Sequence, residues 1–257
     1  TYDTVFPKII LKNSTIKLKD KSINNTINFK INTLIVSSIK DVLTINAKFF
    51  HKSSLDPITL IYHAKKVEGN NISKAFISGN SVNLPYDLLP QSLKQIRSDR
   101  ISFRIWMDLN NMKIEKLAGN IAADKLDVKL PLMNLKIKNV NSDILYVQNK
   151  TLETLSLMRL NYHLNDKKVN DNKIVVSKSK SKQVKVFIKN VSYQIMDVLS
   201  KKTNLYNYDY LSKLKNPSIR NLQIHTSNKN ILNYFSFTLD STLFELNEQY
   251  QLNDISF

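Results

Sequence analysis

Four histidines are the side chains of this 257-residue chain that most readily bind metals or transfer protons. They are His51, His63, His163 and His225. If residues 41–52 and 55–66 form a hairpin, a rise of about 3.3 Å per residue separates His51 from His63 by more than about 10 Å. Neither has an Asp or Glu at the spacing of a metal site. We therefore expect solvated or hydrogen-bonded histidines and no metal site.

The other groups that could perform catalysis lack the neighbours they would need. Ser78 and Ser192 are not embedded in the Gly-rich turn that exposes a hydrolase nucleophile. Asp108, Asp124 and Asp127 are expected on strand faces or turns, where they do not form an acid/base pair. The absence of Cys excludes thiol catalysis, disulfides and Cys-ligated zinc. We expect no enzymatic activity and no cofactor.

The charge is strongly basic, with 38 Lys and Arg against 21 Asp and Glu and a formal net charge of +17. Such a charge favours anionic partners, either nucleic acid or a membrane surface. The basic residues are scattered from Lys8 to Lys229, however, and Lys, Asn and Ile are abundant together, as in proteins from AT-rich genomes. We favour a solvated basic surface over a dedicated polyanion site, because a nucleic-acid footprint would be clustered.

The densest basic run has two interpretations. It consists of Lys178, Lys180, Lys182, Lys185 and Lys189. The favoured one is a sheet edge that lysines protect against the addition of further strands. The alternative is attraction to anionic lipid head groups. Only Phe187 is near enough to stack on a base, so we do not expect nucleic acid as the partner.

Apolar and polar residues alternate along several stretches, which predicts strands with one apolar and one wet face, as antiparallel sheets permit. The clearest stretch is 101–109, in which Trp106 falls on the polar face and is expected to pack under a loop or helix, with a role at a lipid interface as the alternative. The residues that we select from these stretches as one apolar face are Ile27, Phe29, Ile31, Leu43, Ile45, Phe49, Ile101, Phe103, Ile105, Met107, Val186, Phe235, Phe237 and Leu239.

Two segments interrupt the alternation and predict short helices at two connections. Residues 85–96 and 193–214 carry apolar residues at helical spacing, and each follows one strand and precedes another. The strand ends Asn80 and Asn190 lie 110 residues apart, and the strand starts Ile101 and Ile219 lie 118 apart. This recurrence predicts two stacked copies of one unit, at about 1–130 and 131–257.

Several stretches, taken in order, resemble a known family. They are Phe6–Ile16, Ile77–Leu84 with the helix expected after it, Ile105–Leu109, Leu117–Ile121, Asp124–Leu126, Val186–Tyr193, Leu214–Leu222 and Phe235–Phe257. Together they are similar to the repeats of the YhdP branch of the AsmA-like family, which is related to TamB. The sequence departs from the family by having Asn110 and Asn111 in place of Gly in one turn and no Gly near Pro217. Asn tolerates the left-handed backbone, so the turns are expected to survive.

The resemblance implies an all-β fold: an elongated, twisted antiparallel sheet curled into an open groove, with the fourteen selected residues lining it. It implies a single segment of a larger repeating protein that carries phospholipids across the periplasm between inner and outer membrane. Its partners would be phospholipids, flanking repeats of the same chain, and the inner membrane through an anchor outside residues 1–257. Two alternatives remain: a structural or adhesive β-rich envelope protein with a filled core, and a basic nucleic-acid-binding module.

Overall fold

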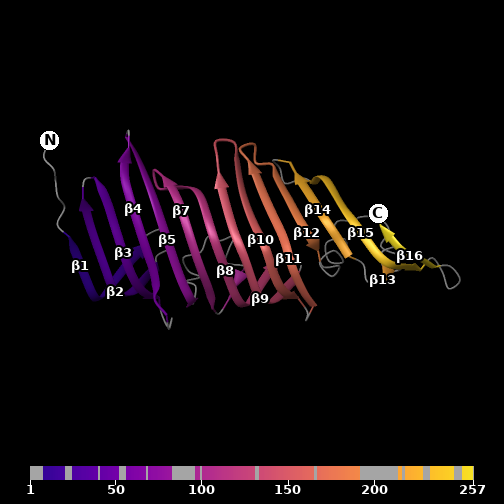
Figure 1. Ribbon diagram of the computed structural model, residues 1–257, viewed down its shortest axis with the longest axis horizontal. Coiled ribbons are helices and arrows are strands. Elements are labelled where there is room, and N and C mark those ends of the chain that lie inside the picture. The colour runs from indigo at the N-terminus through magenta and orange to yellow at the C-terminus, as the bar shows by residue number, and fades with distance from the viewer. Residues whose placement is uncertain are drawn as a thin grey trace.

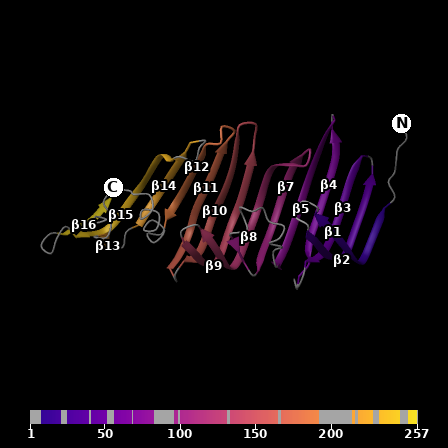
Figure 2. The same cartoon turned by 180° about the vertical axis from the view of Figure 1, so that it is seen from behind.

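The chain forms one long antiparallel β-sheet (Figures 1 and 2). The computed structural model describes residues 8–20, 25–39, 41–51, 56–67, 69–82, 96–98, 100–130, 133–164, 167–191, 214–215, 218–227, 232–245 and 251–256. Within these ranges every regular element is a strand, so the prediction of an all-β antiparallel fold is confirmed. The sheet does not close into a barrel, because β1 and β16 lie at opposite ends of it (Figure 1).

Sixteen strands make up this sheet. Their bounds are β1 Ile9–Asp20, β2 Asn25–Ile39, β3 Val42–His51, β4 Ile58–Val67, β5 Asn70–Val82, β6 Ile96–Arg97, β7 Ile101–Asn110, β8 Lys113–Leu130, β9 Met133–Gln148, β10 Leu152–Leu164, β11 Lys167–Ser179, β12 Val184–Val191, β13 Leu214–Lys215, β14 Ser218–Thr226, β15 Leu232–Glu245 and β16 Gln251–Ser256. Strands adjacent in sequence are mostly adjacent in the sheet, as expected for a meander joined by short turns.

The two predicted helices fall almost entirely outside the described residues. Of the segments 85–96 and 193–214, the structure describes only the last residue of each. Ile96 begins β6 and Leu214 begins β13, so at these two positions the helix prediction is wrong. Each is paired to a neighbouring strand, which satisfies its backbone groups as well as a helix would.

One arrangement of strands occurs twice. β6 and β7 pair one after the other with β8, with Ile96 opposite Val128 and Ile101 opposite Ala123. β13 and β14 pair in the same way with β15, with Leu214 opposite Phe244. The strand before each gap also pairs with the strand after it, β5 with β7 and β12 with β14. The division into units at 1–130 and 131–257 stays a prediction.

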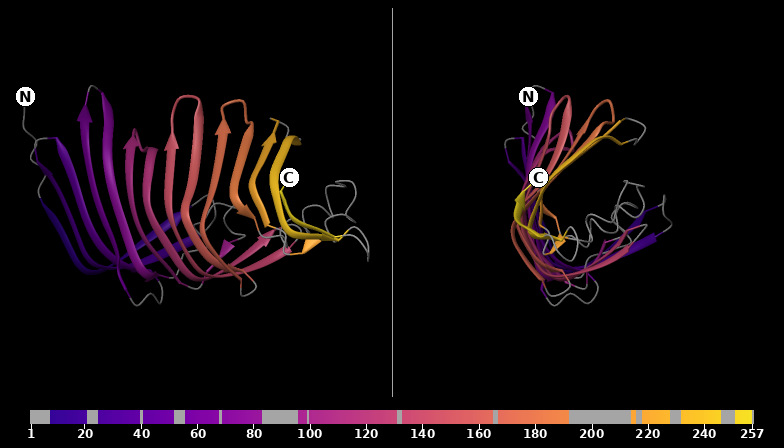
Figure 3. Two further views of the ribbon diagram at one scale, coloured as in Figure 1. Left: turned by 45° about the vertical axis from the view of Figure 1, so that its right-hand side comes forward. Right: turned by 90° about the vertical axis from the view of Figure 1, so that its right-hand side faces the viewer.

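A line of β-bulges and register shifts crosses the sheet, within the longer strands such as β1, β8 and β10 and at one end of β5 and β12. Six residues within strands have the left-handed backbone, with φ between 48° and 54°: Asn13, Asn139, Arg159, Asp171 and Asn221, and Ser81 near the end of β5. A bulge adds a residue to one strand and bends it. Figure 3, right, looks along the length of the sheet and shows that its strands curve into an open arc. We call this line the crease.

The crease changes the spacing of residues on one face. In a regular strand, successive residues on a face are two positions apart. At the crease the register makes them three apart in nine strands. The pairs are Leu11 and Ser14, Ile31 and Leu34, Gly79 and Val82, Ala123 and Leu126, Ile137 and Val140, Leu157 and Leu160, Val169 and Asn172, Ile188 and Val191, and Ile219 and Leu222.

Side chains replace the backbone hydrogen bonds that the bulges interrupt. The buried Asn172 accepts from the amides of Lys173 (2.8 Å) and Asn190 (2.9 Å) and donates to the carbonyl of Asn190 (2.7 Å). On the other face, Asn161 accepts from the amide of Asp171 (2.9 Å) and donates to the carbonyl of Arg159 (2.9 Å). Both amide side chains therefore act as short pieces of a neighbouring strand.

Two ion pairs join neighbouring strands on that same face. Arg159 pairs with Asp143, and this hydrogen bond raises the pKa of the Arg159 guanidinium. Lys189 Nζ lies 2.7 Å from Asp171 Oδ2, and its hydrogen bond holds the pKa of Asp171 below the usual value. Because these groups are largely exposed, each pair adds little stability. Both pairs nevertheless lie at the crease, where one joins β9 to β10 and the other joins β11 to β12.

Truncation of Asn172 should destabilise the protein more than truncation of Asn161. Asn172→Ala leaves two amides and a carbonyl without partners where water cannot reach, which should lower the free energy of unfolding by about 2–4 kcal/mol. Asn161→Ala, the matched control, exposes its freed groups to water and should cost less than about 1.5 kcal/mol. Denaturant unfolding followed by circular dichroism measures both, and equal losses would contradict the bridging role of Asn172.

Candidate binding face

One face of the sheet carries two uninterrupted ladders of apolar residues, which the register follows from strand to strand. Ladder one is Leu11, Leu34, Ala47, Leu60, Ile77, Ile105, Gly119, Ile144, Leu157, Ile174, Ile188 and Leu222. Ladder two is Ile9, Val36, Ile45, Tyr62, Ala75, Met107, Leu117, Tyr146, Leu155, Val176, Val186, Ile224 and Phe235. Neither contains a charged residue.

Burial identifies this face as the concave one. Val82 is 0% exposed and Ile219 and Leu222 are each 1% exposed, and all three lie on this face beside the crease. Side chains on the inside of a bend converge and shield one another from water. A second group of buried residues, Val140, Leu160, Tyr162 and Leu164 with Ala123, continues the same line. We call this side the inner face and the opposite side the outer face.

Away from the crease the inner face stays partly open to solvent. Among the described side chains of the two ladders, only Ala47, Ala75 and Leu222 are buried. Ile9, Leu11 and Leu155 are exposed, and the remaining ones are half-buried. Most of the described buried residues therefore follow the crease, and the ladders beside it present apolar surface that the described strands do not cover.

The register places all fourteen residues selected from the sequence at positions of the inner face. Leu43, Ile45 and Phe49 lie on β3, Ile101, Phe103, Ile105 and Met107 on β7, and Val186 on β12. Phe29 and Phe49 meet edge to face, with ring centroids 5.4 Å apart, and Ile31 is buried beside them. For Ile27, Phe235 and Leu239 only the backbone positions are described. Contact of these residues with lipid stays a prediction.

Most of each ladder was missed from the sequence: the fourteen selected residues include only Ile105 of ladder one, and Ile45, Met107, Val186 and Phe235 of ladder two. Leu157, Leu160 and Tyr162 all belong to the inner face of β10, but the bulge at Arg159 separates Leu157 from Leu160 by three positions instead of two. On β2 the run Leu34–Val36 is apolar on both faces and shows no alternation. These positions could have been found from a strand in which the apolar residues move from odd-numbered to even-numbered positions, or the reverse, beside a polar residue.

The outer face is more polar and carries the charged groups. One of its ladders reads Lys12, Thr33, Lys48, Thr59, Ser78, Arg104, Asn120 and Asp143. Trp106 also lies here; it is 52% exposed and contacts Phe76, with ring centroids 5.1 Å apart. The expectation that Trp106 packs under a loop or helix is therefore wrong, because about half of the indole is exposed.

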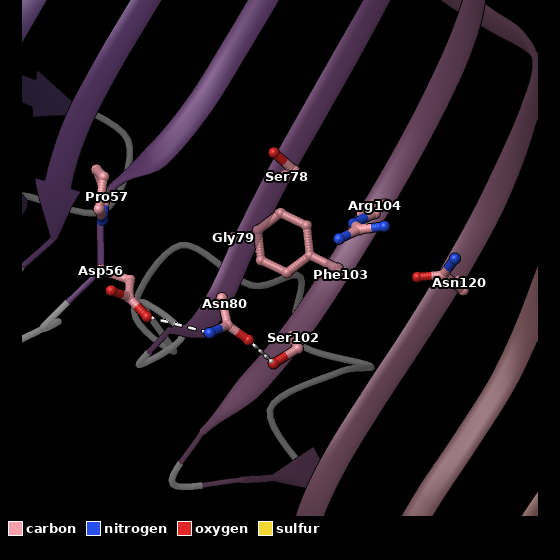
Figure 4. A pocket seen from close by; sticks show the side chains of 9 residues that line it. All are labelled: Asp56, Pro57, Ser78, Gly79, Asn80, Ser102, Phe103, Arg104 and Asn120. Carbon is pink, nitrogen blue, oxygen red and sulfur yellow. Dashed lines mark hydrogen bonds between the residues drawn. The ribbon is translucent and has the colours of Figure 1, made fainter.

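A shallow cavity of about 520 Å³ lies at one end of β5 and β7, where outer-face side chains and the inner-face positions Gly79 and Phe103 both line it (Figure 4). It is lined by Asp56, Pro57, Ser78, Gly79, Asn80, Ser102, Phe103, Arg104 and Asn120. Asn80 donates to Asp56 (3.2 Å), and Ser102 donates to Asn80 (3.0 Å). Asp56, Asn80 and Ser102 are thus engaged with one another, and the lining residues include neither a nucleophile next to a base nor a pair of carboxylates.

The histidines do not assemble into a site. The hydroxyl of Thr44 lies 3.2 Å from His63 Nδ1, and the side-chain amide of Asn139 lies 3.4 Å from His163 Nδ1. In the β3–β4 hairpin Ile58 pairs with Phe49 and His63 with Thr44, whereas His51 lies beyond the last paired residue of this hairpin. Among the described residues, no group of three or more His, Asp or Glu could hold a metal ion.

The interpretation of the lysine run as a sheet edge is wrong. β11, which contains Lys178, pairs with β10 on one side and β12 on the other, and β12 in turn pairs with β14. Both strands are therefore internal to the sheet. Lys180 and Lys182 lie in the turn that joins them, at the rim of the inner face.

In comparisons with protein-family models, with curated proteins and with solved structures, nothing matches this chain. The described residues include no helix long and apolar enough to cross a membrane.

Burial of Tyr162 on the inner face predicts a loss of stability at alkaline pH. Burial raises the pKa of Tyr162 above 10.0, while a hydrogen bond with Asn172 opposes the shift. The phenol of Tyr162 therefore loses its proton at a lower pH in the unfolded chain than in the folded protein. Its contribution to the free energy of unfolding is fully present below pH 10 and is lost as the pH rises through the pKa of the folded state. Tyr162→Phe should flatten this fall, measured by urea unfolding across alkaline pH. An unchanged slope would contradict the buried neutral phenol.

Proposed function

We propose that this chain is a non-enzymatic segment of a lipid-transfer bridge. The inner face holds the acyl chains of phospholipids along the length of the sheet, and their head groups remain in water beyond the rim. The proposal rests on one observation: two apolar ladders cross twelve and thirteen strands without a charged residue. At a strand separation of about 4.8 Å, thirteen strands give an apolar path of roughly 58 Å.

The energetics of such a path suit transfer as well as binding. Each CH₂ group removed from water contributes about 0.8 kcal/mol. This interaction is non-directional, so an acyl chain that moves by one strand exchanges one apolar neighbour for another and breaks no hydrogen bond. A charged residue in a ladder would interrupt the path, since leaving it unpaired against hydrocarbon costs several kcal/mol.

The partial exposure of the inner face favours an external ligand over a filled core. In a closed sandwich, the residues of both ladders would be packed between two sheets and almost all buried. Here Leu155, in ladder two, is 37% exposed, and most other members are half-buried. Exposed apolar surface of this length is rare on a protein without a partner for it.

The setting of the proposal comes from the resemblance to the AsmA-like family. It is the periplasm, between the inner and outer membranes, with an inner-membrane anchor outside residues 1–257. Among the described strands β1 pairs only with β2, so the opposite edge of β1 can accept a strand of a flanking repeat. Such an addition would extend both ladders, which begin at Ile9 and Leu11 of β1.

A charge placed on the inner face should abolish lipid binding, whereas the same charge on the outer face should not. Ile105→Asp replaces a half-buried member of ladder one, and Arg104→Asp replaces its exposed neighbour on the same strand. We expect Ile105→Asp to reduce bound phospholipid at least about tenfold, as a penalty of more than 1.4 kcal/mol implies. Native mass spectrometry of the purified proteins, with lipid extraction, measures the bound lipid.

Circular dichroism of both variants separates lost binding from lost folding. If the wild-type protein carries no phospholipid and takes up none from vesicles, the proposed function is wrong. If both variants lose lipid equally while remaining folded, binding does not depend on the inner face.

A further inference from the structure

The tip of the β11–β12 hairpin concentrates groups that bind phosphate. Residues 178–182 read Lys-Ser-Lys-Ser-Lys, and the three lysines are exposed. The hydroxyls of Ser179 and Ser181 are 2.7 Å apart, and Ser179 Oγ accepts from the amide of Gln183 (3.2 Å). Three ammonium groups and two hydroxyls thus share one short turn. Ammonium groups make charge-assisted hydrogen bonds to phosphate oxygens, which are stronger than those between neutral groups.

The turn has a defined conformation that holds these groups together. Ser179 donates its amide to the carbonyl of Gln183 and accepts from the amide of Lys182, both at 2.9 Å. Lys182 has a φ of 62°, which closes the turn tightly. The amide of Lys180 donates to the carbonyl of Thr151 (3.1 Å), so the tip is also tied to the neighbouring β9–β10 turn.

The tip lies where the apolar inner face ends. On β11, Ile174 belongs to ladder one, Val176 to ladder two, and Lys178 is the next inner-face position, opposite Val184. At about 3.3 Å per residue, the backbone distance from Ile174 to Lys178 is about 13 Å. A lipid with its chains against the two ladders would therefore bring its phosphate to the rim.

The charge of the tip is not neutralised by its surroundings. Within the described residues no carboxylate forms an ion pair with Lys178, Lys180 or Lys182. Glu153 is opposite Lys178 in the register, and Lys150 lies in the adjacent turn. One carboxylate therefore faces four lysines, and the tip remains cationic.

We propose that the β11–β12 tip binds the phosphate of a phospholipid whose acyl chains lie on the inner face, and that it selects lipids with a net negative head group. This inference rests on the proposed function and adds the class of lipid that the segment prefers. The tip attracts zwitterionic lipids less, because their own ammonium group is repelled by the same lysines.

The test compares uptake of fluorescent phosphatidylglycerol and phosphatidylcholine, each offered in separate phosphatidylcholine-based donor vesicles. The test variant combines Lys178→Gln, Lys180→Gln and Lys182→Gln. The control combines Lys12→Gln, Lys48→Gln and Lys74→Gln, which removes the same charge from exposed positions of the outer face. The wild-type protein and the control should prefer phosphatidylglycerol at least about fivefold, as several lysines near one anionic group imply. The tip variant should lose this preference and still take up phosphatidylcholine.

Each other outcome decides against the inference in a distinguishable way. A wild-type protein that takes up both lipids equally, or a tip variant that keeps its preference, overturns the selection but leaves the proposed function intact. Uptake of neither lipid by the wild type overturns both. A further experiment adds soluble glycerol phosphate as a competitor of lipid uptake. If it competes at the concentration at which the lipid binds, the tip is a phosphate site that is independent of the inner face, and it does not recognise a lipid.

Discussion

The described part of the structure depends on one constraint: its strands form a single-layer sheet, and among them no second layer buries the apolar face. In sandwiches, two sheets shelter each other's side chains, and in α/β proteins helices cover the sheet. Within the described part of this chain, curvature supplies the shelter. The bulges at Arg159 and Asp171 bend adjacent strands at neighbouring positions, and Leu160 and Tyr162 become buried on the inside of the bend. The bend must be aligned across strands, because one straight strand would separate from its neighbours.

Alignment of the bulges explains why polar side chains lie so deep in an apolar face. Every bulge removes regular backbone hydrogen bonds, and a buried amide or carbonyl without a partner is costly. Asn172, which is 1% exposed, restores three such bonds, and Ser142, also 1% exposed, donates to the carbonyls of Asp143 (2.9 Å) and Met158 (3.1 Å). These residues are polar because the backbone at the crease requires partners, and an assignment based on hydrophobicity alone would exclude them from the inner face.

The sequence predicts the strands that cross the sheet without a bulge. On β3 and β7, strict alternation identified the inner positions from Leu43 to Phe49 and from Ile101 to Met107 correctly, because nothing interrupts the period of two. On β10 and β14 it failed. Asn221 is a residue type that adopts the left-handed backbone readily, but Arg159 is not, so its φ of 49° reflects the packing of neighbouring strands rather than local preference. The position of β11 and β12 inside the sheet depends on their pairing with β10 and β14, which the local sequence does not reveal. For this reason the lysines of these strands were interpreted as belonging to an edge strand.

Gly79 and Gly119 show that the space available for side chains on the inner face is limited near the crease. A Cβ on Gly119, in ladder one, would collide with the carbonyl oxygen of Arg104, so the close approach of β7 and β8 fixes this residue. A Cβ on Gly79 would collide with Val82 and lie 3.0 Å from the ring of Phe103, which fills the space a side chain would occupy. Close packing here makes residue size the constraint. Along β11 towards Lys178 the side chains are more exposed, so the size of each residue matters less than whether it is apolar. The inner face is therefore closely packed along its crease and open along its rim.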